Sequence, residues 1–474
     1  MKNFCTSEPF VLESGEVLPA LTISYTTFGQ LNNDSSNVVW IFHALTGNAN
    51  PAEWWTNLVG VGKAIDPNKD FIICSNTLGS PYGTTSPVSV NPNTGEYYGE
   101  DFPFITIRDM VNAQKVLLDH LNIKKIQLGI GGSMGGQQLL EWAIDSPDLF
   151  KNICLLATNA KMSPWAIACN ETQRMILGGN TPEALKAARA VAMLTYRTYD
   201  IYNKCQSEGT DEKVVDFKAS SYQQYQGEKF LSRFDSASYL CLTKAMDSHN
   251  VGRGRGGYKK ALQKIKANTL IFGVQSDLLF PIQEQKILRK YIKKADLKII
   301  KSPYGHDGFL TEGDIIDKHL RLFRYKKQGW ALSKSLRLVS QFLFSFFDLI
   351  KEAKIRRLNF ESSPKSHQHP KCFFWRNFHF TQSLPIRKWF SRLNVHRHSP
   401  SGIVPAHPQA VLSLECPQDI HPLGSLVHAQ ASTNLGKSKF HLSVARQACQ
   451  LPDKSKIIHF VIIATFRSGL NFQK

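Results

Sequence analysis

The feature that most constrains the fold of this chain is a serine enclosed by glycines between a strand-like run and a helix-like run. Residues 131–136 read GGSMGG, follow the apolar stretch 125–130 and precede the helical pattern 137–144. This order is that of a nucleophile elbow, in which small neighbours permit a strained turn that lifts a serine hydroxyl above a sheet. An incidental serine in a glycine-rich turn would not need the strand and helix on either side. The pattern therefore predicts an α/β fold with Ser133 as a nucleophile.

Other short apolar runs indicate the rest of the sheet. They are rich in β-branched residues and bounded by turn residues, as buried parallel strands usually are. They cover residues 37–42, 71–75, 269–274 and 297–301. Helical patterns lie between them, including 107–121, and a closing helix is expected at 314–323. Alternating strands and helices predict a mostly parallel sheet flanked by helices.

A long helix-favouring stretch interrupts this alternation. Segments such as 182–196 and 224–246 replace the strand-like runs between residues 159 and 257. We therefore expect residues 159–257 to form a helical lid insertion between two parts of the core, 1–158 and 258–325. These 325 residues are called the body below.

Most of the positive charge lies outside the body. Residues 326–474, the tail, hold 22 Lys and Arg against 6 Asp and Glu, which leaves 35 and 32 of the chain's 57 and 38 for the body. A nearly neutral body gives no reason to expect nucleic acid as its partner, whereas the tail leaves that question open. The tail is either a reading-frame or read-through extension, which we favour, or a basic disordered segment that contacts nucleic acid or anionic lipid.

Several other classes of protein are disfavoured. Residues 1–15 lack a basic stretch followed by an apolar one, so we expect no secretory signal and a cytoplasmic location. The apolar patches 338–350 and 457–466 are shorter than the roughly 18 to 20 residues that span a bilayer, so we expect no membrane span. The nine cysteines show no paired metal-ligand spacing, and we expect neither a metal nor a cofactor.

A serine hydroxyl needs a base, and this fold places an acid and then a histidine after the nucleophile. His306 lies in the turn PYGHDG after a late strand, and Asp277 directly follows the strand one element earlier. Asp277 would hold the tautomer of His306 and stabilise its imidazolium. The predicted triad is thus Ser133, Asp277 and His306. The other histidines of the body are interpreted as surface or structural residues: His43, His120, His249 and His319.

Two backbone amides are candidates for the oxyanion hole, where each donor contributes roughly 3 to 4 kcal/mol. One is the N–H of Met134, directly after the nucleophile. The other comes from the loop after an early strand, residues 43–47 with the sequence HALTG. We assign Leu45 in preference to Ala44 as its donor.

These motifs together resemble a known family. HALTG at 43–47, LG at 78–79 with YGTTSP at 82–87, the elbow, SDLLFP at 276–281 and GHDGFL at 305–310 are similar to homoserine O-acetyltransferases of the α/β-hydrolase superfamily. The similarity ends near residue 323 and leaves the tail unmatched. It implies an α/β-hydrolase fold and a homodimer that serves methionine biosynthesis. It also implies ping-pong transfer of acetyl from acetyl-CoA, the co-substrate, through Ser133 to the hydroxyl of L-homoserine.

The resemblance also implies where the amino acid binds. Arg189, Tyr196 and Asp307 match the family's substrate residues, and the first two are seven residues apart on one helix face. An Arg fork suits an α-carboxylate and Asp307 suits an α-ammonium. Without the resemblance, we would interpret Arg189 as a residue on a solvent-exposed helix face and Tyr196 as an aromatic residue packed within the lid.

Other functions stay open at this point. The same triad serves a serine esterase, and a succinyl donor or a serine acceptor fits too, since one methylene changes binding by only about 1 to 3 kcal/mol. A catalytically silent protein that binds through its tail is a further alternative. The run RGRGG at 253–257 resembles an RNA-binding tract, but we interpret it as the loop that returns from lid to core, with arginines that could meet the phosphates of CoA.

Overall fold

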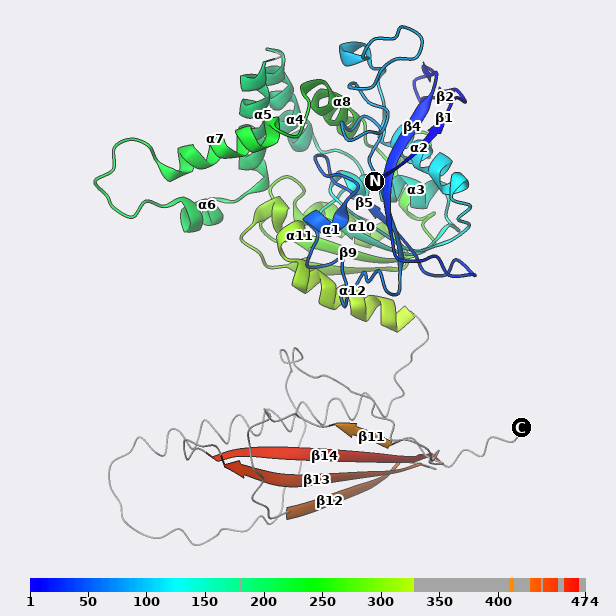
Figure 1. Ribbon diagram of the computed structural model, residues 1–474, viewed down its shortest axis with the longest axis vertical. Coiled ribbons are helices and arrows are strands. Elements are labelled where there is room, and N and C mark those ends of the chain that lie inside the picture. Colours follow the sequence, from blue (N-terminus) through cyan, green and yellow to red (C-terminus); the bar gives the residue numbers. More distant parts are fainter. Residues whose placement is uncertain (180, 328–408, 413–426, 436–437, 451–455, 469–474) are drawn as a thin grey trace. The chain divides into compact units, whose positions relative to one another are not determined.

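The computed structural model describes residues 1–179, 181–327, 409–412, 427–435, 438–450 and 456–468 (Figure 1). The chain divides into two compact units, Met1–Leu332 and Ser333–Lys474. The first unit contains the elbow and every residue predicted to take part in chemistry.

An eight-stranded sheet forms the centre of the first unit. Strands β5 to β10 are parallel to one another, and β1 and β4 add an antiparallel edge. The order across the sheet is β1 (Lys2–Thr6), β4 (Leu21–Phe28), β6 (Phe71–Ser75), β5 (Val38–Phe42), β7 (Ile126–Gly132), β8 (Phe150–Leu156), β9 (Asn268–Val274) and β10 (Ala295–Ile300). A separate hairpin pairs β2 (Phe10–Val11) with β3 (Val17–Leu18). The predicted mostly parallel α/β sheet is confirmed.

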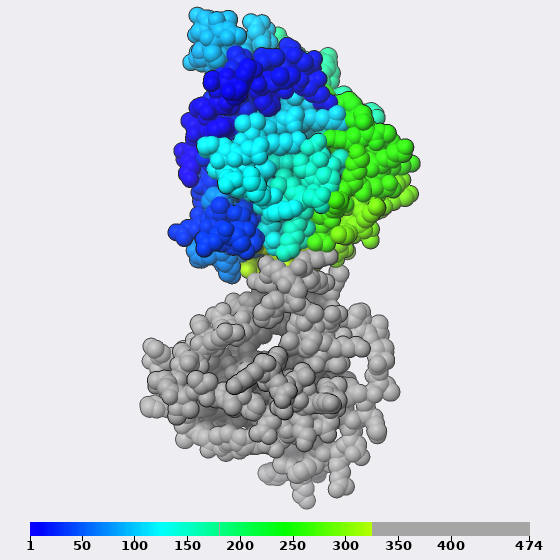
Figure 2. All heavy atoms as spheres, turned by 90° about the vertical axis from the view of Figure 1, so that its right-hand side faces the viewer, coloured from blue at the N-terminus to red at the C-terminus, as the bar shows by residue number. Residues whose placement is uncertain are grey.

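Helices cover both faces of this sheet. The core helices and short turns are α1 (Pro51–Trp54), η1 (Gly99–Asp101), α2 (Ile107–His120), α3 (Met134–Asp145), α9 (Tyr258–Leu262), α10 (Ile282–Tyr291), η2 (Gly305–Asp307), α11 (Gly308–Thr311) and α12 (Gly313–Lys327). Helix α2 begins at a reciprocal capping box, in which Thr106 and Asp109 each accept the other's backbone N–H. Segments far apart in the sequence adjoin on one face of this unit, where blue, cyan and green regions meet (Figure 2).

Side chains that alternate along the strands build two hydrophobic cores. In β5, Trp40 points to the core that contains residues of α2, α3 and α10, whereas Ile41 points to the core that contains α12 residues. Both side chains are fully buried. A parallel strand buried on both faces reads as a continuous apolar run, which explains why these strands could be predicted.

Of the six described helices between β8 and β9, five lie within the segment predicted as the insertion. They are α4 (Pro164–Leu177), α5 (Pro182–Tyr196), α6 (Tyr199–Gln206), α7 (Lys218–Leu231) and α8 (Ser236–Asp247). Helices α4, α5 and α8 group at the top of the view, and α6 and α7 extend to the left (Figure 1). The helical stretch expected at 224–246 is divided, because the side chain of Asp235 caps α8 by accepting the Ser238 N–H at 2.7 Å. A cap of this kind starts a new helix where apolar spacing alone suggests continuity.

The insertion joins the core through a narrow two-stranded neck, formed by residues 160–162 and 249–251. Lys161 and Asn250 form an antiparallel bridge. Beside it, the Met162 N–H donates to the His249 carbonyl and the Val251 N–H donates to the Ala160 carbonyl, both at 3.0 Å. The chain therefore enters and leaves the insertion at adjacent points.

The second unit contains a four-stranded antiparallel sheet. Its order is β11 (Gln409–Leu412), β14 (Lys456–Ser468), β13 (Ser438–Gln450) and β12 (Val427–Leu435). The apolar patch 457–466 lies in β14, whereas 338–350 lies outside the described residues. In the part of the chain that is described, no helix is long and apolar enough to cross a membrane. The origin proposed for the tail stays a prediction.

Candidate active site

Ser133 occupies a strained backbone position between β7 and α3. Its φ of 53° and ψ of −125° are rarely adopted by residues other than glycine. Three hydrogen bonds hold it there: its N–H donates to the Leu156 carbonyl at 2.9 Å, and its carbonyl accepts from Thr158 Oγ1 at 2.9 Å and from the Gln137 N–H at 3.1 Å. The neighbouring strand β8 thus supports the turn that was predicted as an elbow.

Two glycines of the elbow are required by close backbone contacts. A Cβ on Gly131 would lie 2.5 Å from the carbonyl oxygen of Gly135, and a Cβ on Gly135 would lie 2.2 Å from that of Phe42. Real Cβ atoms do not approach so closely. Because Gly131 and Gly135 lack a Cβ, the start of α3 can pack closely against the end of β5, where the 43–47 loop begins.

The three residues of the predicted triad lie in one hydrogen-bonded chain. His306 Nε2 is 2.9 Å from Ser133 Oγ, and His306 Nδ1 is 2.8 Å from Asp277 Oδ2. The other carboxylate oxygen, Asp277 Oδ1, accepts the N–H groups of Leu279 and Phe280, both at 2.9 Å. Ser133, Asp277 and His306 are all buried. The turn after β9 and the turn after β10 thus place the acid and the base as expected.

The surroundings of His306 assign its protons. A carboxylate only accepts hydrogen bonds, so Nδ1–H donates to Asp277 and Nε2 accepts the Ser133 hydroxyl. Burial alone lowers the pKa of His306, but the charge and hydrogen bond of Asp277, with the charge of Asp307, outweigh it and leave the pKa raised. This arrangement can remove a proton from Ser133 Oγ and retain it as a stabilised imidazolium.

The two predicted oxyanion donors flank the elbow. Met134 is the first residue of α3, and Leu45 lies in the turn closed by the Gly47 N–H donating to the Ala44 carbonyl at 2.9 Å. Within the described residues, neither the Leu45 nor the Met134 N–H has a hydrogen-bond acceptor. Both amides are therefore available to a ligand. The preference for Leu45 over Ala44 stays a prediction.

His43 supports the beginning of this loop. Its Nδ1–H donates to the Ala44 carbonyl at 2.8 Å, and its Nε2 accepts the Thr77 N–H at 3.0 Å. Burial lowers the pKa of His43 to about 4, so the ring is neutral at ordinary pH. His43 therefore has a structural role, as the sequence suggested.

Helix α5 carries Arg189 and Tyr196 toward the triad. The Arg189 guanidinium lies 5.5 Å from the ring of Tyr196 and 5.1 Å from that of Phe230. The Tyr196 ring in turn lies 5.8 Å from the His306 ring. Among the described residues, Arg189 makes no ion pair. The aromatic rings thus position the guanidinium, and its positive charge remains available to bind an anion.

Asp307 already has a cationic partner. Arg197 Nε donates to Asp307 Oδ2 at 2.6 Å, and the Arg197 guanidinium lies 5.6 Å from the Tyr304 ring. The structure therefore places the predicted ammonium ligand beside the base, but in an ion pair that sequence reasoning missed. No local signal in the sequence pointed to this pair, because its two residues are 110 positions apart.

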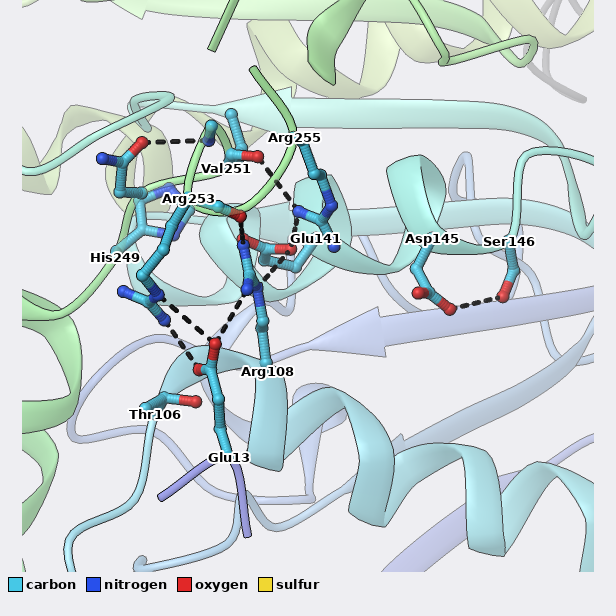
Figure 3. Close-up of polar contacts among 12 residues, drawn as sticks. Glu13, Thr106, Arg108, Glu141, Asp145, Ser146, His249, Val251, Arg253 and Arg255 are labelled. Atoms are coloured by element: carbon cyan, nitrogen blue, oxygen red, sulfur yellow. Dashed lines mark hydrogen bonds and ion pairs between the residues drawn. The ribbon is translucent and has the colours of Figure 1, made fainter. Parts of the chain in front are cut away.

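The arginines of the RGRGG run are engaged in a polar network with the core (Figure 3). Arg253 Nη2 pairs with Glu13 Oε2 at 2.7 Å, and Arg255 Nη1 pairs with the buried Glu141 at 2.5 Å. Arg108 contacts both acids, at 2.8 Å for Glu13 and 3.5 Å for Glu141. The run is therefore a loop fastened to α2 and α3, which supports its interpretation as the return from lid to core.

Fold and site together define an α/β-hydrolase-fold protein in which a buried serine, histidine and aspartate form one hydrogen-bonded chain, and the family model described as alpha/beta hydrolase fold matches residues 37–313. A homoserine O-acetyltransferase of Cyclobacterium marinum is 48% identical over 336 residues, which cover 69% of this chain and 95% of that one. The chain therefore belongs to the homoserine O-acetyltransferase family, and the resemblance seen in the motifs is confirmed.

Solved structures agree with this placement. A homoserine O-acetyltransferase from Staphylococcus aureus is similar with a TM-score of 0.59 and 29% identity, over 68% of this chain and 94% of that one. Esterase E22 has a TM-score of 0.63 and 24% identity, over 68% of this chain and 99% of that one. The second similarity reflects the shared fold and does not distinguish transfer from hydrolysis.

Proposed function

We propose that this chain transfers acetyl from acetyl-CoA to the side-chain hydroxyl of L-homoserine, a step of methionine biosynthesis, through an ester on Ser133. The observation that carries the proposal is the hydrogen-bonded chain of Ser133, His306 and Asp277 beside helix α5, whose Arg189 has no anionic partner among the described residues. The name of the relatives supplies homoserine as the acceptor and acetyl as the transferred group, whereas acetyl-CoA as the donor rests on the family resemblance. No cofactor is needed for this chemistry.

In the first half-reaction, His306 Nε2 takes the proton of Ser133 Oγ as that oxygen attacks the thioester carbonyl carbon. The tetrahedral intermediate collapses, the C–S bond breaks, and the leaving CoA sulfur takes the proton from His306. In the second half-reaction, His306 takes the proton of the homoserine hydroxyl, whose oxygen attacks the acetyl-serine carbonyl. Collapse releases O-acetylhomoserine, and Ser133 Oγ regains the proton.

Both tetrahedral intermediates carry negative charge on the former carbonyl oxygen. We assign the N–H groups of Leu45 and Met134 as its donors, since both are free of acceptors among the described residues and flank the nucleophile. One oxyanion hole would serve both half-reactions, because the acyl carbon stays at Ser133 Oγ.

The amino acid would bind between α5 and the His306 turn. Arg189 would pair with its α-carboxylate, with Tyr196 beside it, and Asp307 would accept its α-ammonium. Since Asp307 already pairs with Arg197, the ammonium would share that carboxylate. A charged acceptor site of this kind favours transfer to an amino acid over transfer to water.

The test is CoA release from acetyl-CoA by the purified full chain, measured with L-homoserine, with L-serine and with neither. Release that depends on homoserine supports the proposal. Equal release in all three mixtures identifies an esterase, and release with serine identifies a serine acyltransferase. Succinyl-CoA in place of acetyl-CoA tests the alternative donor.

Assembly and location are proposed on the resemblance alone. We propose a cytoplasmic homodimer and no membrane partner. Light scattering on the purified chain measures the mass in solution, and a monomer would contradict the first part. Binding of the full chain to labelled RNA or DNA, compared with residues 1–325, tests the nucleic-acid alternative left open for the tail.

A further inference from the structure

A single arginine of the insertion contacts the loop predicted to hold an oxyanion donor. Arg233 lies between α7 and α8, and its Nη1 donates to the Thr46 carbonyl at 2.7 Å and to the Tyr82 hydroxyl at 2.7 Å. These partners are 187 and 151 residues away in the chain. One guanidinium nitrogen thus joins the insertion, the 43–47 loop and the segment around Tyr82.

The loop has few other restraints at this end. The Ala44 carbonyl is occupied by Gly47 and by His43, which fix its beginning. The Leu45 N–H shares its planar peptide with the Ala44 carbonyl, which accepts the Gly47 N–H at 2.9 Å. The Gly47 N–H in turn shares its peptide with the Thr46 carbonyl, which accepts from Arg233. Arg233 therefore acts on the direction of the Leu45 N–H through the hydrogen bond that closes this turn.

The segment around Tyr82 closes a ring of contacts with the same loop. Asn76 Nδ2 donates to the Tyr82 carbonyl at 2.6 Å, and Asn76 Oδ1 accepts the Ala49 N–H at 2.7 Å. The ring of Phe234, next to Arg233, packs edge-on against Tyr82 at 5.8 Å. Arg233 therefore completes a closed set of contacts among the insertion, the Tyr82 segment and the C-terminal end of the 43–47 loop.

The charge of Arg233 is not explained by an ion pair. Among the described residues no carboxylate pairs with it, and its guanidinium lies 5.3 Å from the ring of Phe230, the same ring that contacts Arg189. A donor that only stabilised the fold would not need a charge, whereas a charge-assisted bond holds a carbonyl more firmly.

We propose that Arg233 is a positioning residue that orients the 43–47 loop, so that the oxyanion hole is complete only when the insertion is docked on the core. The inference rests on the proposed function and adds a dependence of the oxyanion hole on the lid. The Arg189 side chain should affect the acceptor half-reaction alone. Arg233 should affect both half-reactions, because both use the same oxyanion donors.

The experiment compares the full chain with Arg233→Ala, Arg233→Lys and Tyr82→Phe. Lys229→Ala is the matched control, because it removes a cation four positions before Arg233 whose ammonium, among the described residues, contacts the Tyr225 ring and no carboxylate. Rapid-quench assays measure acetylation of Ser133 by acetyl-CoA and its deacetylation by homoserine. Hydrogen exchange measures the backbone amides of residues 43–47, and circular dichroism checks folding.

We expect Arg233→Ala to slow both half-reactions by similar factors, about 10- to 100-fold, because a displaced donor loses much of its effect. The KM for homoserine should change less than threefold, and exchange at residues 43–47 should become faster. Arg233→Lys should recover part of each loss and remains informative if the alanine variant misfolds. Tyr82→Phe should cost less, and Lys229→Ala should match the wild type.

Unchanged exchange and unchanged half-reactions in Arg233→Ala would overturn the inference. A loss confined to the homoserine step with a raised KM would also overturn it, because Arg233 would then bind substrate. If the wild type itself forms no acetyl-enzyme, the proposed function fails. The exchange comparison still decides whether Arg233 orients the loop.

Discussion

Replacing Asp277 by Asn should remove most of the activity while leaving the fold intact. In the native protein, Asp277 Oδ1 accepts two backbone N–H groups and Oδ2 accepts His306 Nδ1–H at 2.8 Å. An asparagine must turn its oxygen toward the two N–H groups, because its NH2 cannot accept them. Its NH2 then faces Nδ1, which has to become an acceptor.

The consequence is the wrong tautomer of His306. Its proton moves to Nε2, which lies 2.9 Å from Ser133 Oγ and then donates to that oxygen and cannot take its proton. The same tautomer change in a serine protease lowers kcat by about 10⁴-fold, or about 5 kcal/mol at roughly 1.4 kcal/mol per factor of ten. We expect a loss of that size in acetyl-enzyme formation. The retained backbone contacts should keep the change in unfolding free energy below about 2 kcal/mol.

The assay is single-turnover acetylation by acetyl-CoA, followed by quenching and intact-mass measurement. Asp296→Asn is the matched control, since it makes the same substitution at an exposed carboxylate whose ion pair, within the described residues, is with Lys298 at 3.1 Å. Urea unfolding of both variants shows whether the fold survives. A loss below tenfold in a folded Asp277→Asn protein would refute the tautomer argument.

Four further outcomes are expected. Ser133→Ala should form no acetyl-enzyme by intact-mass measurement. Ser133→Gly should be more stable to urea than Ser133→Ala by about 1 kcal/mol, because glycine adopts a positive φ without strain. Equal stability of the two variants would contradict a strained backbone at Ser133. Arg189→Ala should raise the KM for homoserine at least tenfold without slowing acetylation by acetyl-CoA; equal loss of both would remove its assigned role. Because the neutral form of His306 is the base and its pKa is raised above the ordinary 6.5, the acetylation rate should rise with pH through an apparent pKa above that value; a midpoint below it would contradict the assignment. Gly135→Ala should destabilise the protein by about 3 kcal/mol or more, since the new Cβ would lie 2.2 Å from the Phe42 carbonyl oxygen. A urea unfolding midpoint close to that of the wild type would disprove this contact.

The sheet and the triad could be predicted because each has a local signature. The strand β7, the elbow and α3 are consecutive in the chain, so short-range patterns define Ser133. Asp277 and His306 could be found because the fold fixes the order of acid and base along the chain. Strand β8, which supports the elbow through Leu156, was missed because Lys151 and Asn152 interrupt its apolar run.

Contacts between distant side chains could not be predicted. The pair of Arg197 with Asp307 spans 110 residues, and nothing in the spacing distinguishes Arg197 from any other arginine on the lid. The same holds for Arg233 and Thr46. In the RGRGG run, Glu13 and Glu141 pair with the two arginines, and neither carboxylate could be assigned to them from the sequence. Local composition shows that charge is present but not where its partner lies.

The neck has a consequence for how such a chain can be altered. Lys161 and Asn250 are bridge partners, so their Cα atoms lie about 5 Å apart, a gap that a short turn can close. The 88 residues between them could therefore be exchanged for another segment without interrupting a strand of the sheet or a residue of the triad. Such an exchange would keep Ser133, Asp277 and His306 but lose the contact of Arg233 with the 43–47 loop, so a new segment would have to supply both an acceptor site and its own support for the oxyanion donor.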